Sequence, residues 1–384
     1  MSAASKITAW AIWVIAAAIG LHGMWLRFTT GHLAAGYTSY VPWGLWVAGY
    51  IYFIGLSAGA FLLSSLVCVF GVRRLELIAR LTLATAAITL ALALITIWFD
   101  LGHAGRFWET FTRPQFHSMM AWMVWLYTAY LIVILAELYY ALRNELTPSQ
   151  KRRLATLGAL GVPLAVAFHG GVGALFATVG ARPVWHTAVY PIIFLNGALL
   201  SGGALITAIV AFLWPRRDSQ WRDALQLLGK IVLGLLAFDV ILEISEYLVP
   251  MWYGIGGEYH LLRNVLLGPQ WYVFWLIHVT LGVVIPGLIL WRGRGAAPIG
   301  GAAALIAVTY LAVRIELVVP GLVRSPLPGL AQAYQSARLS FHYSPTFFEW
   351  EILIGVVALG VGLFYLVWKL LPLVPVGSAS EARS

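Results

Sequence analysis

Charged residues are scarce in this chain of 384 residues: only 10% are Asp, Glu, Lys or Arg, whereas 61% are hydrophobic. A soluble domain has about 25% charged and about 45–50% apolar residues, so a water-soluble globule could not hide this much apolar surface. The 18 Trp, 17 Tyr and 18 Phe also favour a membrane protein, because aromatic rings gather at bilayer interfaces. The composition therefore predicts a polytopic membrane protein and excludes intrinsic disorder, a collagen-like fibre and a nucleic-acid-binding domain.

Cysteine is almost absent. The single cysteine, Cys68, lies within an apolar run and cannot build a disulfide framework, an iron–sulfur cluster or a Cys-rich zinc site. Any metal would need histidines and carboxylates, or would belong to a partner. The sequence also lacks a phosphate-binding glycine loop, a nucleophile elbow and an HExxH motif. We therefore expect no metal site and no common hydrolase or nucleotide site in this chain.

Long apolar runs dominate what is present. A hydrocarbon core about 30 Å thick needs about 20 apolar residues per helix. Ten stretches qualify, at 8–26, 43–70, 78–99, 118–142, 154–178, 187–213, 226–249, 270–291, 300–319 and 349–371. The first continues to Trp25 without a small-x-small exit, so we interpret it as a retained helix rather than a cleaved signal. The predicted fold class is all-α, with about ten transmembrane helices in one integral membrane domain over 1–384.

The charges that remain are distributed unevenly between the two sides. On the N-terminal side lie 16 of the 24 basic residues, and the positive-inside rule then predicts that both termini are cytoplasmic. All nine histidines fall in outer loops or in the outer parts of helices. Either long outer loops simply tolerate polar residues, or proton-exchanging chemistry takes place at the outer face.

An internal repeat divides the predicted helices. Gly55-Leu56-Ser57-Ala58-Gly59-Ala60-Phe61-Leu62 recurs 143 residues later as Ala198-Leu199-Leu200-Ser201-Gly202-Gly203-Ala204-Leu205. A parallel duplication would give two four-helix bundles, at 43–178 and 187–319, with the first and last helices peripheral and a cytoplasmic tail at 372–384. The alternative is that small residues at this spacing are common wherever membrane helices pack closely.

Three carboxylates share one face of the seventh predicted helix. Asp239, Glu243 and Glu246 stand at i, i+4 and i+7. Acidic residues within a membrane are costly and mark ion or proton paths by default, so we expect this row to carry protons. The alternative for Glu246 is an interfacial ion pair with Arg263 or Arg314.

The other acidic residues have more ordinary interpretations. We expect Glu316, Glu349 and Glu351 to form a structural ion-pair cluster with Arg314 near the outer interface. Glu137 lies near the inner end of the fourth helix, where it either extends to the surface or opens an inner proton route.

Two histidine-containing segments suggest a flat pocket lined by rings. They are Asp100-Leu101-Gly102-His103-Ala104-Gly105-Arg106-Phe107-Trp108 and His169-Gly170-Gly171, the latter followed by Arg182-Pro183-Val184-Trp185. A quinone headgroup needs hydrogen-bond donors, aromatic walls and a nearby proton donor. Haem ligation by a pair among His22, His169 and His278 is an alternative, but nothing in their spacing selects a pair.

Several segments of the chain resemble one family. Pro42-Trp43-Gly44-Leu45-Trp46, Tyr50 and Gly55-Leu56-Ser57-Ala58-Gly59 resemble the second-helix signature of the polysulfide reductase (NrfD-like) membrane subunits. The Asp100-Leu101-Gly102…Arg106 loop is similar to the family's Asp-x-Gly-Arg segment, with His103 and Ala104 intervening. The stretch from His169 to Trp185 and the C-terminal Pro345-Thr346…Glu349-Trp350-Glu351 with Leu371-Pro372-Leu373-Val374-Pro375 are also similar.

The resemblance implies a haem-free, quinone-handling membrane anchor that is not catalytic alone. Its implied cofactor is a menaquinone or ubiquinone. Its implied partners are a periplasmic ferredoxin-like iron–sulfur subunit and a molybdopterin, hydrogenase or multihaem-cytochrome subunit, at the bacterial inner membrane. The residues implied near the quinone are Trp43, Tyr50, Asp100, His103 and His169. A secondary transporter and a b-type cytochrome membrane subunit remain the alternatives.

Overall fold

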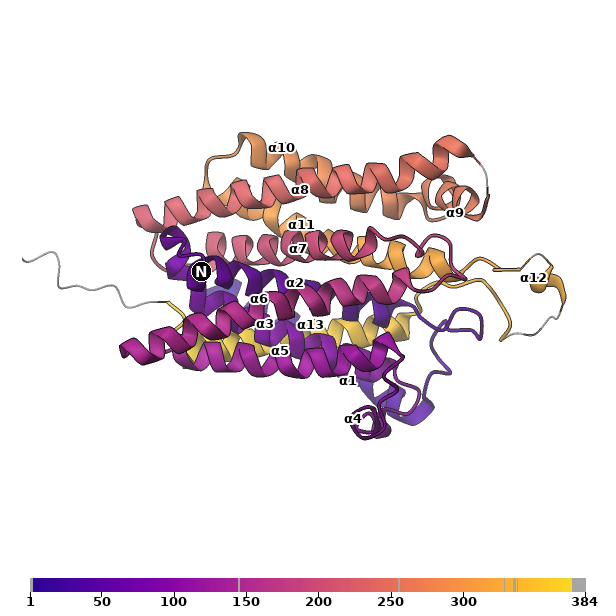
Figure 1. Cartoon of the computed structure of the whole chain (residues 1–384), viewed down its shortest axis with the longest axis horizontal. Coiled ribbons are helices and arrows are strands. Elements are labelled where there is room, and N and C mark those ends of the chain that lie inside the picture. Colours follow the sequence, from indigo (N-terminus) through magenta and orange to yellow (C-terminus); the bar gives the residue numbers. More distant parts are fainter. Residues whose placement is uncertain are drawn as a thin grey trace, which may run out of the picture.

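The computed structural model describes residues 3–143, 146–254, 256–327, 329–333, 336 and 338–374. All regular structure in this part of the chain is helical. The long helices lie side by side along the length of the molecule, and three short helices, α4 (Glu109–Thr112), α9 (Gly256–Leu267) and α12 (Leu330–Ala333), lie at one end (Figure 1). The two ends of the described chain lie at the opposite end (Figure 1).

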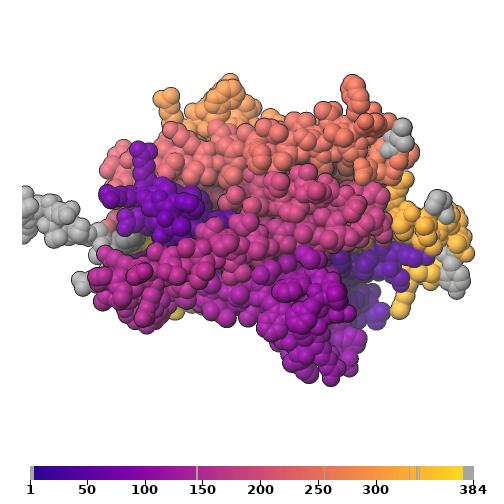
Figure 2. Space-filling model, in the orientation of Figure 1, coloured from indigo at the N-terminus to yellow at the C-terminus, as the bar shows by residue number. Residues whose placement is uncertain are grey.

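The long elements are α1 (Ala3–Thr30), α2 (Leu45–Cys68), α3 (Ala79–Asp100), α5 (Met119–Ala141), α6 (Pro148–Ala177), α7 (Tyr190–Leu213), α8 (Ser219–Tyr253), η3 (Val273–Val284) continuing into α10 (Ile285–Arg292), α11 (Ala296–Leu322) and α13 (Phe347–Leu370). The short ones are η1 (Arg73–Ile78), η2 (Ala104–Arg106), α4 (Glu109–Thr112), α9 (Gly256–Leu267) and α12 (Leu330–Ala333). In Figure 2 the segment around α4 projects from the side of the molecule.

Nine helices in the described part of the chain are long and apolar enough to cross a membrane. The prediction of an all-α polytopic membrane protein is therefore confirmed. The seventh of the ten predicted spans, 226–249, lies within α8 (Ser219–Tyr253), which is not one of these nine. This 35-residue helix carries Lys230, Asp239, Glu243 and Glu246 along an otherwise apolar stretch.

The centre of the molecule is α2, which is buried along most of its length and packs against α3, α6, α7 and α11. The two copies of the repeated motif meet here. A Cβ atom added to Gly59 would lie 2.9 Å from Gly202 Cα, so only glycine permits this approach of α2 to α7. We call α2, α3, α5 and α6 the first helix group, and α7, α8, η3–α10 and α11 the second. The predicted bundle boundaries stay a prediction, and most of the predicted tail 372–384 lies outside the described residues.

The first and last helices pack on each other at the edge of the molecule. α1 contacts α13 where Gly20 meets Gly355, and α13 contacts α3. Most side chains of α1 are exposed. Because hydrocarbon is the natural surrounding of such side chains, this exposure is what a lipid-facing helix requires.

The expected ion-pair cluster of Arg314 with the acidic residues of α13 is wrong. Glu349 instead caps α13, where it accepts hydrogen bonds from the Thr346 amide at 2.9 Å and the Tyr343 hydroxyl at 2.5 Å. Glu351 contacts His22 Nδ1 at 2.9 Å. A carboxylate three residues into a helix accepts hydrogen bonds from free amides at the helix start. The carboxylate of Glu349 is therefore occupied by local hydrogen-bond donors and does not pair with Arg314.

Candidate functional site

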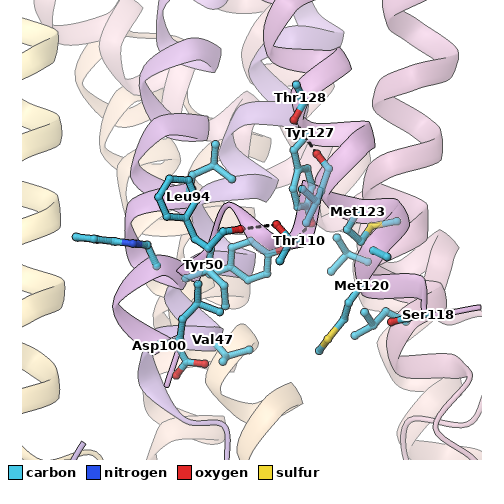
Figure 3. A pocket seen from close by; sticks show the side chains of 18 of the residues that line it. Val47, Tyr50, Leu94, Asp100, Thr110, Ser118, Met120, Met123, Tyr127 and Thr128 are labelled. Atoms are coloured by element: carbon cyan, nitrogen blue, oxygen red, sulfur yellow. Dashed lines mark hydrogen bonds between the residues drawn. The ribbon is translucent and has the colours of Figure 1, made fainter. Parts of the chain in front are cut away.

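A cavity of about 890 Å³ lies in the first helix group, at the end of the molecule that carries α4 (Figure 3). Its walls come from the start of α2, the end of α3, the start of α5, the end of α6 and the segment 107–118. The lining is largely apolar and rich in rings: Trp43, Tyr50, Trp98, Phe107, Phe111, Tyr127 and Phe176. Apolar walls with a few polar groups are typical of small-molecule sites of this size.

Two tyrosines supply the central polar groups of the cavity. The hydroxyls of Tyr50, on α2, and Tyr127, on α5, are hydrogen-bonded to each other, and Figure 3 shows this bond within the cavity lining. One hydroxyl donates and the other accepts, so the pair keeps one O–H donor and unused lone pairs for a ligand. Tyr127 is buried, and its ring packs edge-on against Phe168. The pair is therefore held in place by both packing and hydrogen bonding.

Trp43 forms an aromatic wall at the start of α2. Its ring stacks on Trp185, with ring centroids 6.0 Å apart and an interplanar angle of 23°. The indole N–H of Trp185 donates to the Leu317 carbonyl at 2.8 Å, which fixes this second ring. Phe176 contacts both rings edge-on. The rigid stack offers a flat face on which a planar ligand can lie.

Asp100 ends α3 at the same end of the cavity (Figure 3). Its Oδ1 accepts a hydrogen bond of 2.8 Å from the Tyr37 hydroxyl. Burial, and then the nearby negative charges of Asp100 and Glu349, raise the pKa of Tyr37 well above its usual value, so this loop tyrosine remains a donor. Arg27 holds the turn, because its Nε donates to the Phe99 carbonyl at 2.7 Å and its Nη2 to the Leu101 carbonyl at 2.6 Å.

The positive charge of Arg27 also affects His32, which lies in the loop after α1. Burial is the main cause that lowers the pKa of His32 below 6.5, and the positive charge of Arg27 adds to it. His32 packs its ring near Tyr37 and Trp46. We infer that His32 is neutral at physiological pH.

The structure brings three of the five predicted quinone-site residues together, since Trp43, Tyr50 and Asp100 all line the cavity. His103 is exposed between α3 and η2 and is not a lining residue. His169 is fully buried on α6 but lies on the side facing α7, with its ring 6.1 Å from that of Phe194. It is not a lining residue either, and neither of its ring nitrogens has a hydrogen-bond partner among the described residues.

Sequence reasoning missed Tyr127 and further polar residues of the cavity lining. Among these are Thr110, Gln115 and Ser118. A signal for Tyr127 was present: Tyr127, Tyr130 and Glu137 recur at spacings of three and seven on one helix face. Polar atoms repeated on one face of a membrane helix indicate a buried polar path.

The predicted carboxylate row of α8 lies in the second helix group and is surrounded by polar partners. Asp239 is buried, and its Oδ1 accepts a hydrogen bond of 2.7 Å from Asn196 Nδ2 on α7. The Tyr310 hydroxyl on α11 lies 3.4 Å from both of its carboxylate oxygens. Among the described residues Glu246 has no ion pair with Arg263 or Arg314, and the Tyr190 hydroxyl is its polar neighbour.

His278 joins two further carboxylates. Its Nε2 lies 3.3 Å from Glu243 of α8, and its Nδ1 lies 3.0 Å from Glu316 of α11. His278 is located in η3, which is a π-helix over its whole length. Such wide turns are rare and occur frequently at functional sites. Both ring nitrogens of His278 therefore face carboxylates.

Arg314, on α11, lies against α7 within the second helix group. It is 1% exposed, and its guanidinium is placed over the rings of Phe194, at 4.8 Å, and Tyr310, at 5.0 Å. Its Nε and one Nη have no hydrogen-bond partner among the described residues. Within the same residues, no group of three or more His, Cys, Asp or Glu side chains is arranged to hold a metal ion.

Residues 34–326 match the family described as polysulphide reductase, NrfD. The chain belongs to this NrfD family. The match spans α2 to α11 and so includes both the cavity and the network around Asp239. The resemblance expected from the motifs of α2 and of the Asp100 loop is therefore confirmed.

Curated NrfD-like relatives match nearly the whole chain. A selenate reductase subunit of Mesobacillus selenatarsenatis is 32% identical, over 93% of this chain and 92% of the relative. The Hdr-like menaquinol oxidoreductase integral membrane subunit of Archaeoglobus fulgidus is 29% identical, over 90% and 88%. A putative dimethyl sulfoxide reductase membrane subunit of Halobacterium salinarum is 29% identical, over 92% and 88%. Together with the family match, they support a membrane anchor subunit of a redox complex.

Proposed function

We propose that this NrfD-family chain is the quinone-reactive subunit of a respiratory oxidoreductase, passing electrons between a quinone pool and an iron–sulfur partner subunit. The observation that carries the proposal is the cavity of about 890 Å³ with the Tyr50–Tyr127 pair at its centre. One relative is named as a menaquinol oxidoreductase integral membrane subunit and another as a menaquinone reductase integral membrane subunit, which supports a menaquinone over a ubiquinone.

The residues of the cavity fit a quinone in shape and in chemistry. When bound, a quinone would supply two-electron, two-proton redox chemistry. The stack of Trp43 on Trp185 would hold a flat ring, and the apolar rest of the lining suits an isoprenoid tail. The free O–H of the tyrosine pair would donate to one oxygen of the headgroup and exchange a proton with it.

Asp100 would act as the proton-exchanging group at the mouth of the cavity. It is the acidic residue in the lining, and Tyr37 and the turn held by Arg27 fix its position. His103 and His169 stay proposed as assisting residues. From their positions, His103 would act from the exposed turn after α3, and His169 would act through the α6–α7 contact rather than by touching the ligand.

The orientation of the chain follows from its charges. We propose a bacterial inner-membrane protein with both termini cytoplasmic, because the basic residues are concentrated on that side. The end with α4, α9, α12 and the cavity would then be periplasmic (Figure 1). A ferredoxin-like subunit docked at this end would place its iron–sulfur cluster next to the quinone. Its own partner would be a molybdopterin, hydrogenase or multihaem-cytochrome subunit.

We further propose that Asp239, Glu243 and Glu246 carry protons through the second helix group. Hydrogen bonds connect Asp239 to Asn196 and Tyr310, Glu243 lies close to His278, and Glu246 lies near the Tyr190 hydroxyl. Ionisable groups connected in this way within membrane helices are typical of proton relays.

The quinone site is tested by ligand titration of the complex purified from native membranes. A water-soluble menaquinone analogue is expected to quench tryptophan fluorescence, because Trp43 and Trp98 line the cavity. Tyr127→Phe removes one hydroxyl and should weaken the affinity by about tenfold, the value of one hydrogen bond in a buried site. Tyr139→Phe, on the same helix but exposed, is the matched control and should bind like the wild type. Equal affinity of both variants would contradict the proposed site.

A further inference from the structure

A buried carboxyl group without partners lies at the other end of the first helix group. Glu137, on α5, is 0% exposed, and neither of its carboxylate oxygens has a hydrogen-bond partner among the described residues. The sequence allowed this side chain to extend to the surface, and it does not. An isolated carboxylate in such a place is so costly that the group is expected to carry a proton. A protonated acid within a membrane helix can store and release a proton, and such costly residues typically mark proton paths.

Glu137 shares one face of α5 with the cavity. Tyr127, Tyr130, Ile134 and Glu137 are spaced by three, four and three residues, and all four are buried. Tyr127 lies at the cavity, and Glu137 is ten residues, or about 15 Å, further along the helix. Tyr130 stands between them, and its hydroxyl donates to the Ser57 carbonyl of α2 at 3.2 Å. The row thus leads from the cavity towards the end at which the described chain begins and ends.

The facing side of α2 continues the same row. Ser57, Phe61 and Cys68 are spaced by four and seven residues, and the Ser57 hydroxyl lies 3.5 Å from that of Tyr130. At the far end α6 contributes Gly158, where an added Cβ would lie 3.7 Å from Cys68 Cβ and 3.9 Å from Glu137 Oε1. Glu137 therefore sits where α2, α5 and α6 converge. It is four residues, or about 6 Å, from the end of α5.

An apolar break interrupts the row. Phe61 packs its ring 5.2 Å from that of Tyr130, and Ile134 is the buried residue of α5 between Tyr130 and Glu137. A continuous hydrogen-bonded chain is therefore not formed at rest. A proton can cross this gap only if the Glu137 side chain moves or water enters beside Phe61. We therefore expect proton transfer across the gap to be the slow step of the route.

We propose that Glu137 is the loading group of a proton route that runs along the facing sides of α2 and α5 and connects the cavity with the side of the membrane on which the termini lie. This inference rests on the proposed quinone site. Reduction of one quinone to a quinol takes two electrons, supplied by the iron–sulfur partner, and two protons. Glu137 would pass these protons one at a time through Tyr130 to the Tyr50–Tyr127 pair, and quinol oxidation would return them along the same route.

The first test follows proton uptake by the complete complex in sealed vesicles of uniform orientation. Glu137→Gln keeps the size of the side chain but cannot release a proton, and it should slow quinone-linked proton uptake from the termini side at least about tenfold. Glu76→Gln is the matched control: the same substitution, on an exposed residue near the same end. Uptake by Glu137→Gln at the rate of Glu76→Gln would overturn the route.

A second measurement separates the route from the quinone site itself. The infrared difference spectrum between oxidised and quinone-reduced complex should contain the carbonyl stretch of a buried carboxylic acid in the wild type. This band should disappear in Glu137→Gln and persist at a shifted frequency in Glu137→Asp. A wild-type spectrum without the band, or a band unchanged in Glu137→Gln, would overturn the route even if one variant failed to assemble.

Binding of the menaquinone analogue distinguishes the two failures. If wild type and Glu137→Gln bind the analogue equally well but the infrared band and the uptake are unaffected by the substitution, the route is wrong and the quinone site stands. If the wild type does not bind the analogue, the proposed function fails first. The route predicts equal binding together with lost uptake.

Discussion

In the first helix group, the hydroxyls of Tyr50 and Tyr127 face a cavity of about 890 Å³, whereas in the second the polar groups are packed directly against one another. Asp239 accepts a hydrogen bond from Asn196, and His278 lies between Glu243 and Glu316. The two groups meet at a related motif, where Gly59 contacts Gly202. On the proposed function, the two helix groups would serve different purposes: the first leaves space for a ligand, and the second brings ionisable side chains into contact.

The largest expected effect comes from filling the cavity. Ala121 lines it from α5, and Ala121→Trp should abolish binding of the menaquinone analogue because the indole occupies the ligand's volume. Ala155→Trp, an exposed position on α6, should bind normally in the same fluorescence titration. Retained binding in Ala121→Trp would place the ligand outside the first helix group.

The second group should affect proton transfer and not binding. Asp239→Asn keeps the shape of the side chain but removes its exchangeable proton, so proton-coupled turnover in vesicles should fall about a hundredfold. The affinity for the quinone analogue should remain unchanged. Asp223→Asn, exposed on the same helix, should leave both quantities unaffected. Loss of analogue binding in Asp239→Asn would contradict the proposal that the first helix group binds the quinone and the second transfers protons.

The contact network of the second group should also contribute stability. His278→Ala would leave Glu243 and Glu316 facing each other without the imidazole between them. Breaking one side of a buried ionic contact costs about 3–5 kcal/mol, so the unfolding midpoint in detergent should fall by several degrees. His117→Ala, at an exposed position, should not shift it. Equal midpoints would mean that the contacts of His278 add nothing to stability.

The smallest expected effect concerns the support of Asp100. Tyr37→Phe removes the hydrogen bond of 2.8 Å to Asp100 Oδ1 and should cost about 1 kcal/mol, or about fivefold in turnover, with the cavity intact. The analogue should bind almost as tightly as to the wild type. A loss as large as that of Ala121→Trp would mean that Tyr37 shapes the cavity rather than positions one carboxylate.

The fold was predictable because the bilayer imposes it: apolar runs of about 20 residues must form helices that satisfy their own backbone groups. Helix ends were less predictable. α1 and α8 extend beyond the predicted spans 8–26 and 226–249, because helices continue past the hydrocarbon until a polar group caps them. Asp218, which accepts a hydrogen bond from the Trp221 amide, is such a cap.

The site was predictable only in part. Motifs pointed to Trp43, Tyr50 and Asp100, which the structure brings together. His103 is exposed in the turn after α3. The sequence does not predict which side chains of such a short turn face the solvent. Tyr127 was missed because a tyrosine in a membrane helix is ordinarily expected at the interface. The contact of His278 with two carboxylates depends on a π-helix, which has no sequence signature.

Binding of the quinone by the first helix group is tested most directly by photolabelling the native complex with an azido-quinone and mapping the labelled peptides. We expect the label on the lining of the cavity, within residues 94–131 and around Tyr50, and competition by unlabelled menaquinone should remove it. Competable labelling confined to residues 190–322, in the second group, would contradict the account.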